Sequence, residues 1–429
     1  MAKSYRPETI ALHGGQSPDP TTLSLGVPIH RTSSYVFKNT EHAANLFGLR
    51  ELGTIYTRIG NPTQDVLEQR LSQLEGGAAS LALASGTSAI FYAIITLAQV
   101  GDEIVAANNL YGGTYTQFDA ILPALGITVK FVDPKDPENF QKAITDKTRA
   151  IFIETIGNPL LDVVDVEKIA EVAHRNGLPL IVDATFSTPY LLQTIKFGAD
   201  IVINSLTKWI GGHGTGIGGS ITDAGTFDWK GGKHPLFTEP DSNYHGLRWG
   251  IDLPAPLAPL AFILRARTVP LRNLGAAISP DNAWIFLQGL ETLPLRIVRH
   301  SENALAVAQY LQKHPKVSWV RYPGLPGDPS HELGKKYLKG GFGGVVVFGI
   351  KGGSEAGVKL IDNIPLFSHL ANVGDAKSLI IHPASTTHSQ LTEEQQIAGG
   401  LTPDLVRLSI GIEHIDDILE ALEEGLAQV

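Results

Sequence analysis

The chain contains no cysteine among its 429 residues, and it has a single methionine. The absence of cysteine excludes disulfides, thiolate nucleophiles and cysteine-ligated zinc, so any sulfur chemistry must take place on a substrate. The scarcity of both residue types also fits the avoidance of thermolabile side chains, and we expect some heat tolerance.

Long apolar runs and strong charge are also missing. No uninterrupted apolar run approaches the ~18 residues that a membrane-spanning helix needs, and the first ten residues lack the apolar core of a signal peptide. The formal net charge is −9 and charged residues make up only 18% of the chain, which leaves no electrostatic footprint for nucleic acid. We therefore expect a cytoplasmic enzyme that acts on small molecules and binds neither membrane nor nucleic acid.

Hydrophobic residues make up 43% of the sequence, enough for more than one domain. Short apolar runs alternate with longer amphipathic segments, which predicts an α/β domain with a mainly parallel sheet buried on both faces. The runs are Ser80–Ala84, Glu103–Ala107, Thr128–Val132, Ala150–Glu154, Pro179–Asp183, Ile201–Asn204 and Ile217–Ile221.

The pattern divides the chain into three parts. Residues 1–62 are rich in turn formers and predict an N-terminal arm. Residues 63–279 form the predicted large domain, in which 227–252 reads as an inserted loop, and residues 280–429 form a smaller C-terminal α+β domain. The C-terminal part predicts a helix from Ser279-Pro280 to about His314, apolar runs at Val317–Tyr322, Gly344–Ile350 and Val406–Ile412, and a last helix at Ile415–Gln428.

Three segments could carry chemistry, and each has an ordinary structural alternative. Ala84–Ser88 joins an apolar strand to a helix, where backbone N–H groups and the helix dipole bind phosphate, although many such junctions are plain turns. Asp183 ends a buried strand, where ligands gather in open sheets but where carboxylates also cap helices. Lys208 lies among hydroxyls and glycines, and it could equally be a surface lysine beside a flexible loop.

Taken together, these segments predict a site for pyridoxal 5′-phosphate (PLP). This cofactor needs a phosphate cradle, a carboxylate at its pyridine nitrogen and a lysine for its aldehyde. The chain between Asp183 and Lys208 is long enough for a crossover and one strand, so adjacent strands could deliver both groups to one cofactor.

Two other patterns favour different sites and are weaker. Gly214–Gly219 matches the dinucleotide motif G-x-G-x-x-G, but it leads into an apolar run instead of opening a helix, which argues against a nicotinamide dehydrogenase. His382 and His388 could form a metal pair, but Pro383 lies between them and no acidic ligand is near. We expect no metal and interpret them as loop or core histidines.

Several motifs resemble the Cys/Met-metabolism PLP-dependent enzymes over essentially the whole chain. The matching stretches are Tyr56–Thr63, Leu110–Gly113, Glu154–Pro159, Ser205–Lys208, His382–His388 and Val406–Ser409. The resemblance implies the PLP-dependent transferase fold (fold type I, aspartate-aminotransferase-like), with a large α/β domain and a smaller C-terminal α+β domain. It also implies a homotetramer built as a pair of dimers.

The resemblance assigns a role to each of the matching positions. It implies that Lys208, Asp183 and Tyr111 are catalytic, the first two also holding the cofactor and Tyr111 stacking on its ring. Asn158 would bind the phenolic oxygen of PLP. The phosphate would be held by Gly86, Thr87, Ser205 and Thr207, with Tyr56 and Arg58 supplied by a neighbouring subunit. Substrate would contact Arg407, Asn372 and Tyr56, with Arg407 on its carboxylate.

Within the family, the chain resembles the O-acetylhomoserine sulfhydrylases in its length, its 227–252 insertion and Asn372. Methionine γ-lyases tend to carry cysteine at the position of Gly113. The implied reaction is γ-replacement in methionine biosynthesis, in which O-acetyl-L-homoserine and sulfide give L-homocysteine and acetate; the alternative is γ-elimination by a methionine or cystathionine γ-lyase. The chain departs from the family pattern at Ala184, where many relatives carry asparagine. Asp183 therefore lacks the neighbouring side chain that would help to hold its carboxylate in those relatives.

Overall fold

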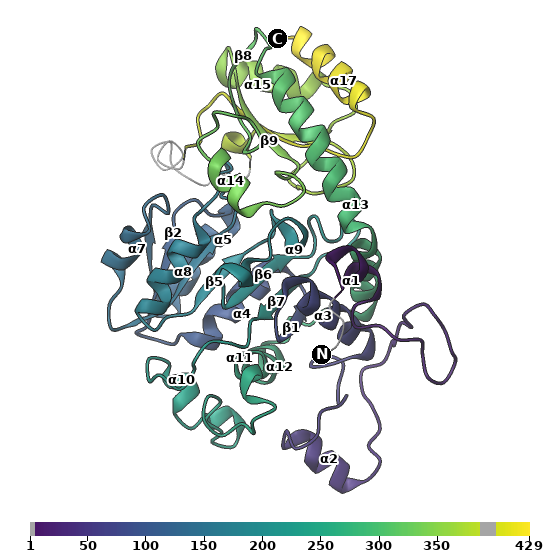
Figure 1. Ribbon diagram of the computed structural model, residues 1–429, viewed down its shortest axis with the longest axis vertical. Coiled ribbons are helices and arrows are strands. Elements are labelled where there is room, and N and C mark those ends of the chain that lie inside the picture. Colours follow the sequence, from purple (N-terminus) through teal and green to yellow (C-terminus); the bar gives the residue numbers. More distant parts are fainter. Residues whose placement is uncertain (1–4, 387–399) are drawn as a thin grey trace.

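The computed structural model describes residues 5–386 and 400–429 (Figure 1). Two sheets organise these residues: a larger one in the middle of the molecule and a smaller one beside the C-terminal helix. None of the helices in these two ranges combines the length and apolar character that crossing a bilayer requires.

The larger sheet has seven strands in the order β1-β7-β6-β5-β4-β2-β3 among the described residues. Strands β2 to β6 pair in parallel, and β7 runs antiparallel to both β1 and β6. The predicted mainly parallel sheet is confirmed. The strands are β1 Ala79–Leu83, β2 Glu103–Ala107, β3 Thr128–Val132, β4 Thr148–Glu154, β5 Leu180–Asp183, β6 Ile201–Ser205 and β7 Gly219–Asp223.

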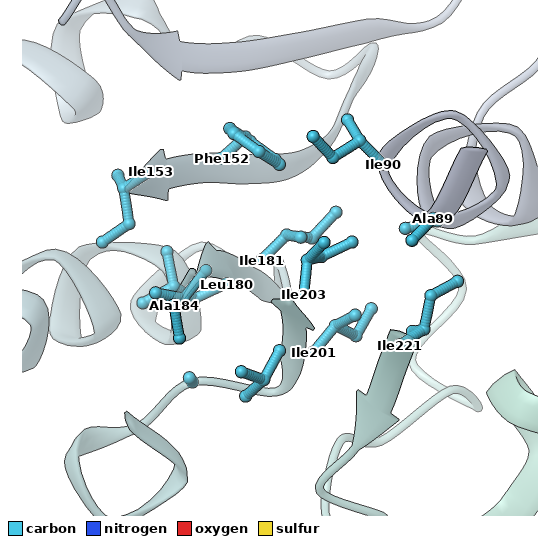
Figure 2. Packing of buried hydrophobic residues seen from close by; sticks show 14 of the residues in the cluster. Ala89, Ile90, Phe152, Ile153, Leu180, Ile181, Ala184, Ile201, Ile203 and Ile221 are labelled. Atoms are coloured by element: carbon cyan, nitrogen blue, oxygen red, sulfur yellow. The ribbon is translucent and has the colours of Figure 1, made fainter. Parts of the chain in front are cut away.

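The central strands are apolar because helices cover them. Figure 2 shows Ala89 and Ile90 of helix α4 (Gly86–Leu97) facing Phe152, Ile203 and Ile221 of the sheet. All five side chains are almost fully buried. Burial on both faces explains why these strands read as continuous apolar runs and not as alternating ones.

Helix boundaries follow local capping rules. Helix α3 (Pro62–Glu75) starts after Asn61, whose side chain accepts the Thr63 N–H, and it ends at Gly76 in the left-handed conformation. Ser279 caps the long helix α13 (Pro280–Leu311) in the same way. The other α-helices are α1 Pro7–His13, α2 Thr40–Phe47, α5 Gly112–Thr116, α6 Leu122–Ala124, α7 Glu138–Ala143, α8 Val166–Arg175, α9 Thr188–Leu191, α10 Pro235–Thr238, α11 Ala261–Ala266, α12 Arg272–Leu274, α14 His331–Tyr337, α15 Gly353–Asn363 and α17 Ile415–Ala427.

The smaller sheet has the order β10-β11-β12-β9-β8 and is mostly antiparallel. Its strands are β8 Val317–Arg321, β9 Val345–Ile350, β10 Ser368–His369, β11 Leu379–Ile381 and β12 Leu405–Ser409. The three longer strands match predicted apolar runs. The short strands β10 and β11 were not predicted, because two or three residues are too few to show a period.

The N-terminal segment extends away from the sheet around α2, which the sequence analysis did not anticipate as a helix (Figure 1). The 227–252 segment is mostly irregular and lies beside this arm. The hydroxyl of Tyr244 donates to the carbonyl oxygen of Phe47 at 2.7 Å, which ties the two together.

A close backbone approach at Gly289 yields a test of the packing. A Cβ on Gly289 of α13 would lie 2.2 Å from the carbonyl oxygen of Ile210, in the loop that follows Lys208. We therefore expect Gly289→Ala to destabilise the protein by about 1–3 kcal/mol despite the better helix propensity of alanine.

Gly357 of α15 is the matched control, since its added Cβ would meet no atom closer than 3.5 Å. Gly357→Ala should be neutral or stabilising by about 0.4–1 kcal/mol. Thermal unfolding of both variants measures the difference. An unfolding midpoint for Gly289→Ala at or above that of the wild type would contradict the close approach.

Candidate functional site

One cavity lies at the carboxyl ends of the parallel strands, where open α/β sheets bind their ligands. It brings together all the predicted site residues except Tyr56 and Arg58. Those lining it are Gly86, Thr87, Tyr111, Asn158, Asp183, Ser205, Thr207, Lys208, Asn372 and Arg407.

The start of α4 forms one end of the cavity. Ser85 caps this helix by accepting the Ser88 N–H, and the N–H groups of Gly86 and Thr87 have no hydrogen-bond partner among the described residues. A Cβ on Gly86 would lie 2.7 Å from Cβ of Ser205, so glycine allows the helix start to approach the end of β6. Backbone N–H groups, the helix dipole and nearby hydroxyls together suit a phosphate.

Two buried carboxylates end neighbouring strands. Parallel pairing places Glu154 of β4 opposite Asp183 of β5, and both line the cavity. Burial raises the pKa of Asp183, and burial together with the charge of Asp183 raises the pKa of Glu154 well above its ordinary value. Two close carboxylates do not ionise together readily, and the larger rise belongs to Glu154, so Asp183 gives up its proton before Glu154 does.

Residues next to Asp183 support its charge. Its side-chain oxygen accepts the N–H of Thr185 at 2.9 Å, which favours the ionised form and moderates the rise in its pKa. Ala184 is fully buried and belongs to the apolar cluster of Figure 2. An asparagine at this position would need polar partners in that cluster, so the departure at 184 is consistent with its surroundings.

Lys208 is held in a turn after β6 and is partly buried. Its backbone N–H donates to Ser205 and its carbonyl oxygen accepts from Gly212. Its Nζ donates to Oδ1 of Asn372 at 2.7 Å. Burial, with a smaller contribution from the positive charge of Arg407, lowers the pKa of Lys208 to about 8. A substantial fraction of this amine is therefore neutral near physiological pH.

Arg407 lies on β12 and is buried in the lining of the cavity. Its Nη1 donates to Oδ1 of Asn158 at 3.3 Å, and no carboxylate forms an ion pair with it in residues 5–386 and 400–429. Burial lowers its pKa to about 10. A buried guanidinium without an acidic partner is costly, and an anionic ligand would offset that cost.

Tyr111 lies at the mouth of the cavity with 49% of its surface exposed. Its backbone N–H donates to Oε1 of Glu154 at 2.7 Å, which ties the tyrosine to the end of β4. A Cβ on Gly113 would lie 2.5 Å from Cε1 of Tyr111, so glycine at 113 leaves room for the ring. A side chain at position 113 would therefore displace the ring of Tyr111.

Glu154 and Thr185 are two polar residues of the cavity to which the sequence alone assigned no role. Glu154 ends a predicted strand and opens a matching motif, so its place at a strand end was a usable signal. Thr185 gave no such signal, because its contacts depend on how the strands pair. Its Oγ1 accepts the N–H of Ser205, on the next strand, at 2.8 Å.

Tyr56 and Arg58 do not line the cavity of their own chain. Both are exposed, and the Arg58 guanidinium lies 5.0 Å from the centre of the Tyr56 ring. The other patterns fall outside the site. Gly214–Gly219 leads into β7 and opens no helix, and His382 is buried against Ser385 and Pro403, while His388 lies outside the described residues.

The cavity residues fit PLP on structural grounds. The phosphate of PLP requires a cradle of N–H groups and hydroxyls, its pyridine nitrogen requires a carboxylate, and its aldehyde requires an amine of lowered pKa. The start of α4, Asp183 and Lys208 supply these groups. Gly86 makes the cradle possible, since any side chain there would meet Ser205.

Comparisons with known proteins agree with this chemistry. The model of the family described as Cys/Met metabolism PLP-dependent enzyme matches residues 8–427. The chain is 58% identical to the O-acetyl-L-homoserine sulfhydrylase of Leptospira meyeri, covering 100% of this chain and 98% of that protein. It is 54% identical to O-acetyl-L-homoserine sulfhydrylase 1 of Thermus thermophilus, over 98% and 99% of the two chains.

A solved structure is similar over its full length. The crystal structure of a putative O-acetylhomoserine (thiol)-lyase from Campylobacter jejuni superimposes with a TM-score of 0.95 at 42% identity, covering 99% of this chain and 100% of that one. That protein carries a pyridoxyl-lysine. The expected fold class is therefore confirmed, and so is PLP as the cofactor.

The electrostatics of Lys208 can be measured in the full chain freed of cofactor. Competitive acetylation across a pH series, quantified by mass spectrometry on the Lys208 peptide, should give a midpoint near the lowered pKa of about 8. Arg407→Gln removes a positive charge and should raise this pKa, although not to the ordinary 10.5, because burial remains. A midpoint that stayed the same or fell would contradict the coupling between the two residues.

Proposed function

The chain belongs to the Cys/Met metabolism PLP-dependent enzyme family, and from this premise we propose that it is an O-acetylhomoserine sulfhydrylase. It combines O-acetyl-L-homoserine with sulfide to give L-homocysteine and acetate, a step of methionine biosynthesis. The names of the relatives in Leptospira and Thermus support this substrate pair, as does the homocysteine synthase of Schizosaccharomyces pombe, 53% identical over 98% of this chain.

One observation carries the proposal: two cationic groups face the cavity without an acidic partner among the described residues. Among the described residues the buried side chain of Arg407 donates only to the neutral amide of Asn158, while the amine of Lys208 donates to the neutral amide of Asn372. A ligand with a carboxylate satisfies Arg407, because guanidinium binds carboxylate through two parallel hydrogen bonds. An amino-acid substrate supplies that carboxylate.

The roles of the residues follow from their chemistry. Bound PLP, once joined to the substrate amine, withdraws electrons from the bond between Cα and its hydrogen. Asp183, ionised at the strand end, holds the pyridine nitrogen in its protonated form. The hydroxyls of Ser205 and Thr207 and the N–H groups of α4 bind the phosphate, and Tyr111 lies where its ring can cover the cofactor.

Lys208 is the proton carrier of this scheme. With a pKa lowered to about 8, its amine is neutral often enough to take the proton from Cα. It then gives that proton up to the bound ligand before it takes a second one from Cβ, because an amine binds only one extra proton. Loss of the Cβ proton lets acetate leave from Cγ with the electrons of the C–O bond. Sulfide then attacks Cγ, and Lys208, with Tyr111 beside it, returns the protons to Cβ and Cα.

The alternative of γ-elimination shares the early steps. In that reaction water, and not sulfide, ends the cycle, and a 2-oxo acid and ammonia appear. The relatives named as sulfhydrylases favour replacement over elimination.

Product analysis tests the reaction directly. With O-acetyl-L-homoserine and sulfide, the purified protein should release acetate and homocysteine in equal amounts. Without sulfide, acetate release should fall sharply, since the nucleophile that completes the cycle is missing. Formation of a 2-oxo acid and ammonia in amounts equal to acetate, even with sulfide present, would overturn the proposal in favour of a γ-lyase.

The lack of a cationic side chain for the phosphate among the described cavity residues supports an active site shared between subunits. The only cationic side chains lining the cavity in the described part of the chain are Lys208 and Arg407, and both serve other ends of the ligand. A doubly charged phosphate is then left to neutral donors. Arg58, exposed on the N-terminal arm beside Tyr56, is well suited to supply the missing charge to a neighbouring subunit. We propose a dimer of this kind, paired into a tetramer.

Subunit mixing tests this sharing. Arg58→Ala and Lys208→Ala proteins should each be nearly inactive, and mixing them under exchange conditions should restore activity, because some hybrid sites then contain both wild-type residues. Mass spectrometry of differently tagged chains shows whether hybrids formed. If hybrids form and are inactive, Arg58 and Lys208 of one chain serve the same active site, and the shared site is ruled out.

A further inference from the structure

The amine of Lys208 contacts a neutral acceptor. Its Nζ donates to Oδ1 of Asn372 at 2.7 Å, and no carboxylate pairs with it in residues 5–386 and 400–429. The two residues are far apart in the sequence, so the contact joins the large sheet to the loop before β11. A neutral acceptor orients an amine without holding it in the charged form as strongly as a carboxylate would.

The loop that carries Asn372 is packed onto the lysine itself. A Cβ on Gly374 would lie 2.6 Å from the backbone nitrogen of Trp209 and 3.0 Å from the carbonyl carbon of Lys208. The N–H of Gly374 donates to Oγ of Ser409 at 2.9 Å, and Val373 is buried. Strand β12, which presents Arg407, therefore also anchors the loop that presents Asn372.

The orientation of the Asn372 amide follows from the donors around it. The protonated amine of lysine only donates, and the neutral amine still carries N–H groups, so in both forms the amine can donate to the amide oxygen that faces Nζ. The Nδ2 group has no hydrogen-bond partner among the described residues, and Asn372 lines the cavity together with Arg407. One end of the amide thus contacts the lysine, while the other is available to the ligand.

We propose that Asn372 is a positioning residue whose side-chain oxygen holds the free amine of Lys208 whenever that amine is not bonded to the cofactor. The contact keeps the amine at one place in the cavity between its release by substrate and its return. The inference rests on the proposed function, in which Lys208 must move protons after its release, and it gives Asn372 a role beyond contact with substrate.

Two substitutions test the contact on the full chain freed of cofactor. Asn372→Asp puts a negative charge at the same place and should raise the pKa of Lys208 by about 1 or more, which makes its acetylation at pH 7 about tenfold slower. Asn372→Leu keeps a similar volume and removes the acceptor, so it should lower the pKa of Lys208 and speed the acetylation. The readout is competitive acetylation of the Lys208 peptide across pH.

Asn363→Asp is the matched control, because Asn363 is exposed at the end of α15 and, within the described ranges, its side chain donates only to the backbone of its own helix. It should leave the reactivity of Lys208 unchanged. In the holoenzyme, Asn372→Leu should lower kcat more than it raises KM, whereas a residue that only binds the substrate carboxylate would mainly raise KM.

The proposal is overturned if the Asp and Leu variants leave the pKa of Lys208 at the wild-type value, or shift it in the same direction. Because acetylation needs no substrate, this result is independent of the products formed. Failure of the sulfhydrylase assignment would appear instead in the product analysis, with the lysine measurement unaffected.

Discussion

Parallel pairing of β4, β5 and β6 is the constraint on which the site depends. It places the last residues of three buried strands, Glu154, Asp183 and Ser205, along one edge of the sheet. Because those strands are apolar and covered by helices, they hold that edge rigidly, and polar groups at their ends are desolvated. The raised pKa values of Glu154 and Asp183 follow from this desolvation.

The second sheet completes the site by bringing a cation to the same cavity. Strand β12 carries Arg407, and through Ser409 it also anchors the loop of Asn372. The two basic residues of the cavity are thus held by neutral amides, which leaves their charge available to a ligand. Among the described residues Arg407 has no acidic partner, and a ligand that carries a carboxylate, such as the proposed amino-acid substrate, would offset the cost of burying its charge.

Much of this arrangement could be predicted from the sequence, for identifiable reasons. The strands of the large sheet were visible because burial on both faces makes them uniformly apolar, and the spacing between Asp183 and Lys208 fits one crossover. Strands β10 and β11 are too short to leave a pattern, and α2 lies in a segment dominated by turn formers. The contacts of Lys208 with Asn372, and of Glu154 with the backbone of Tyr111, join distant segments, so no local pattern could reveal them.

The most direct test of the account is to locate the lysine that binds the cofactor. Borohydride reduction of the holoenzyme, followed by digestion and mass spectrometry, marks that lysine permanently. We expect a single pyridoxyl adduct on Lys208, which lines the same cavity as Asp183. An adduct on a different lysine, or PLP that dissociates unreduced from a protein still active as a sulfhydrylase, would contradict it.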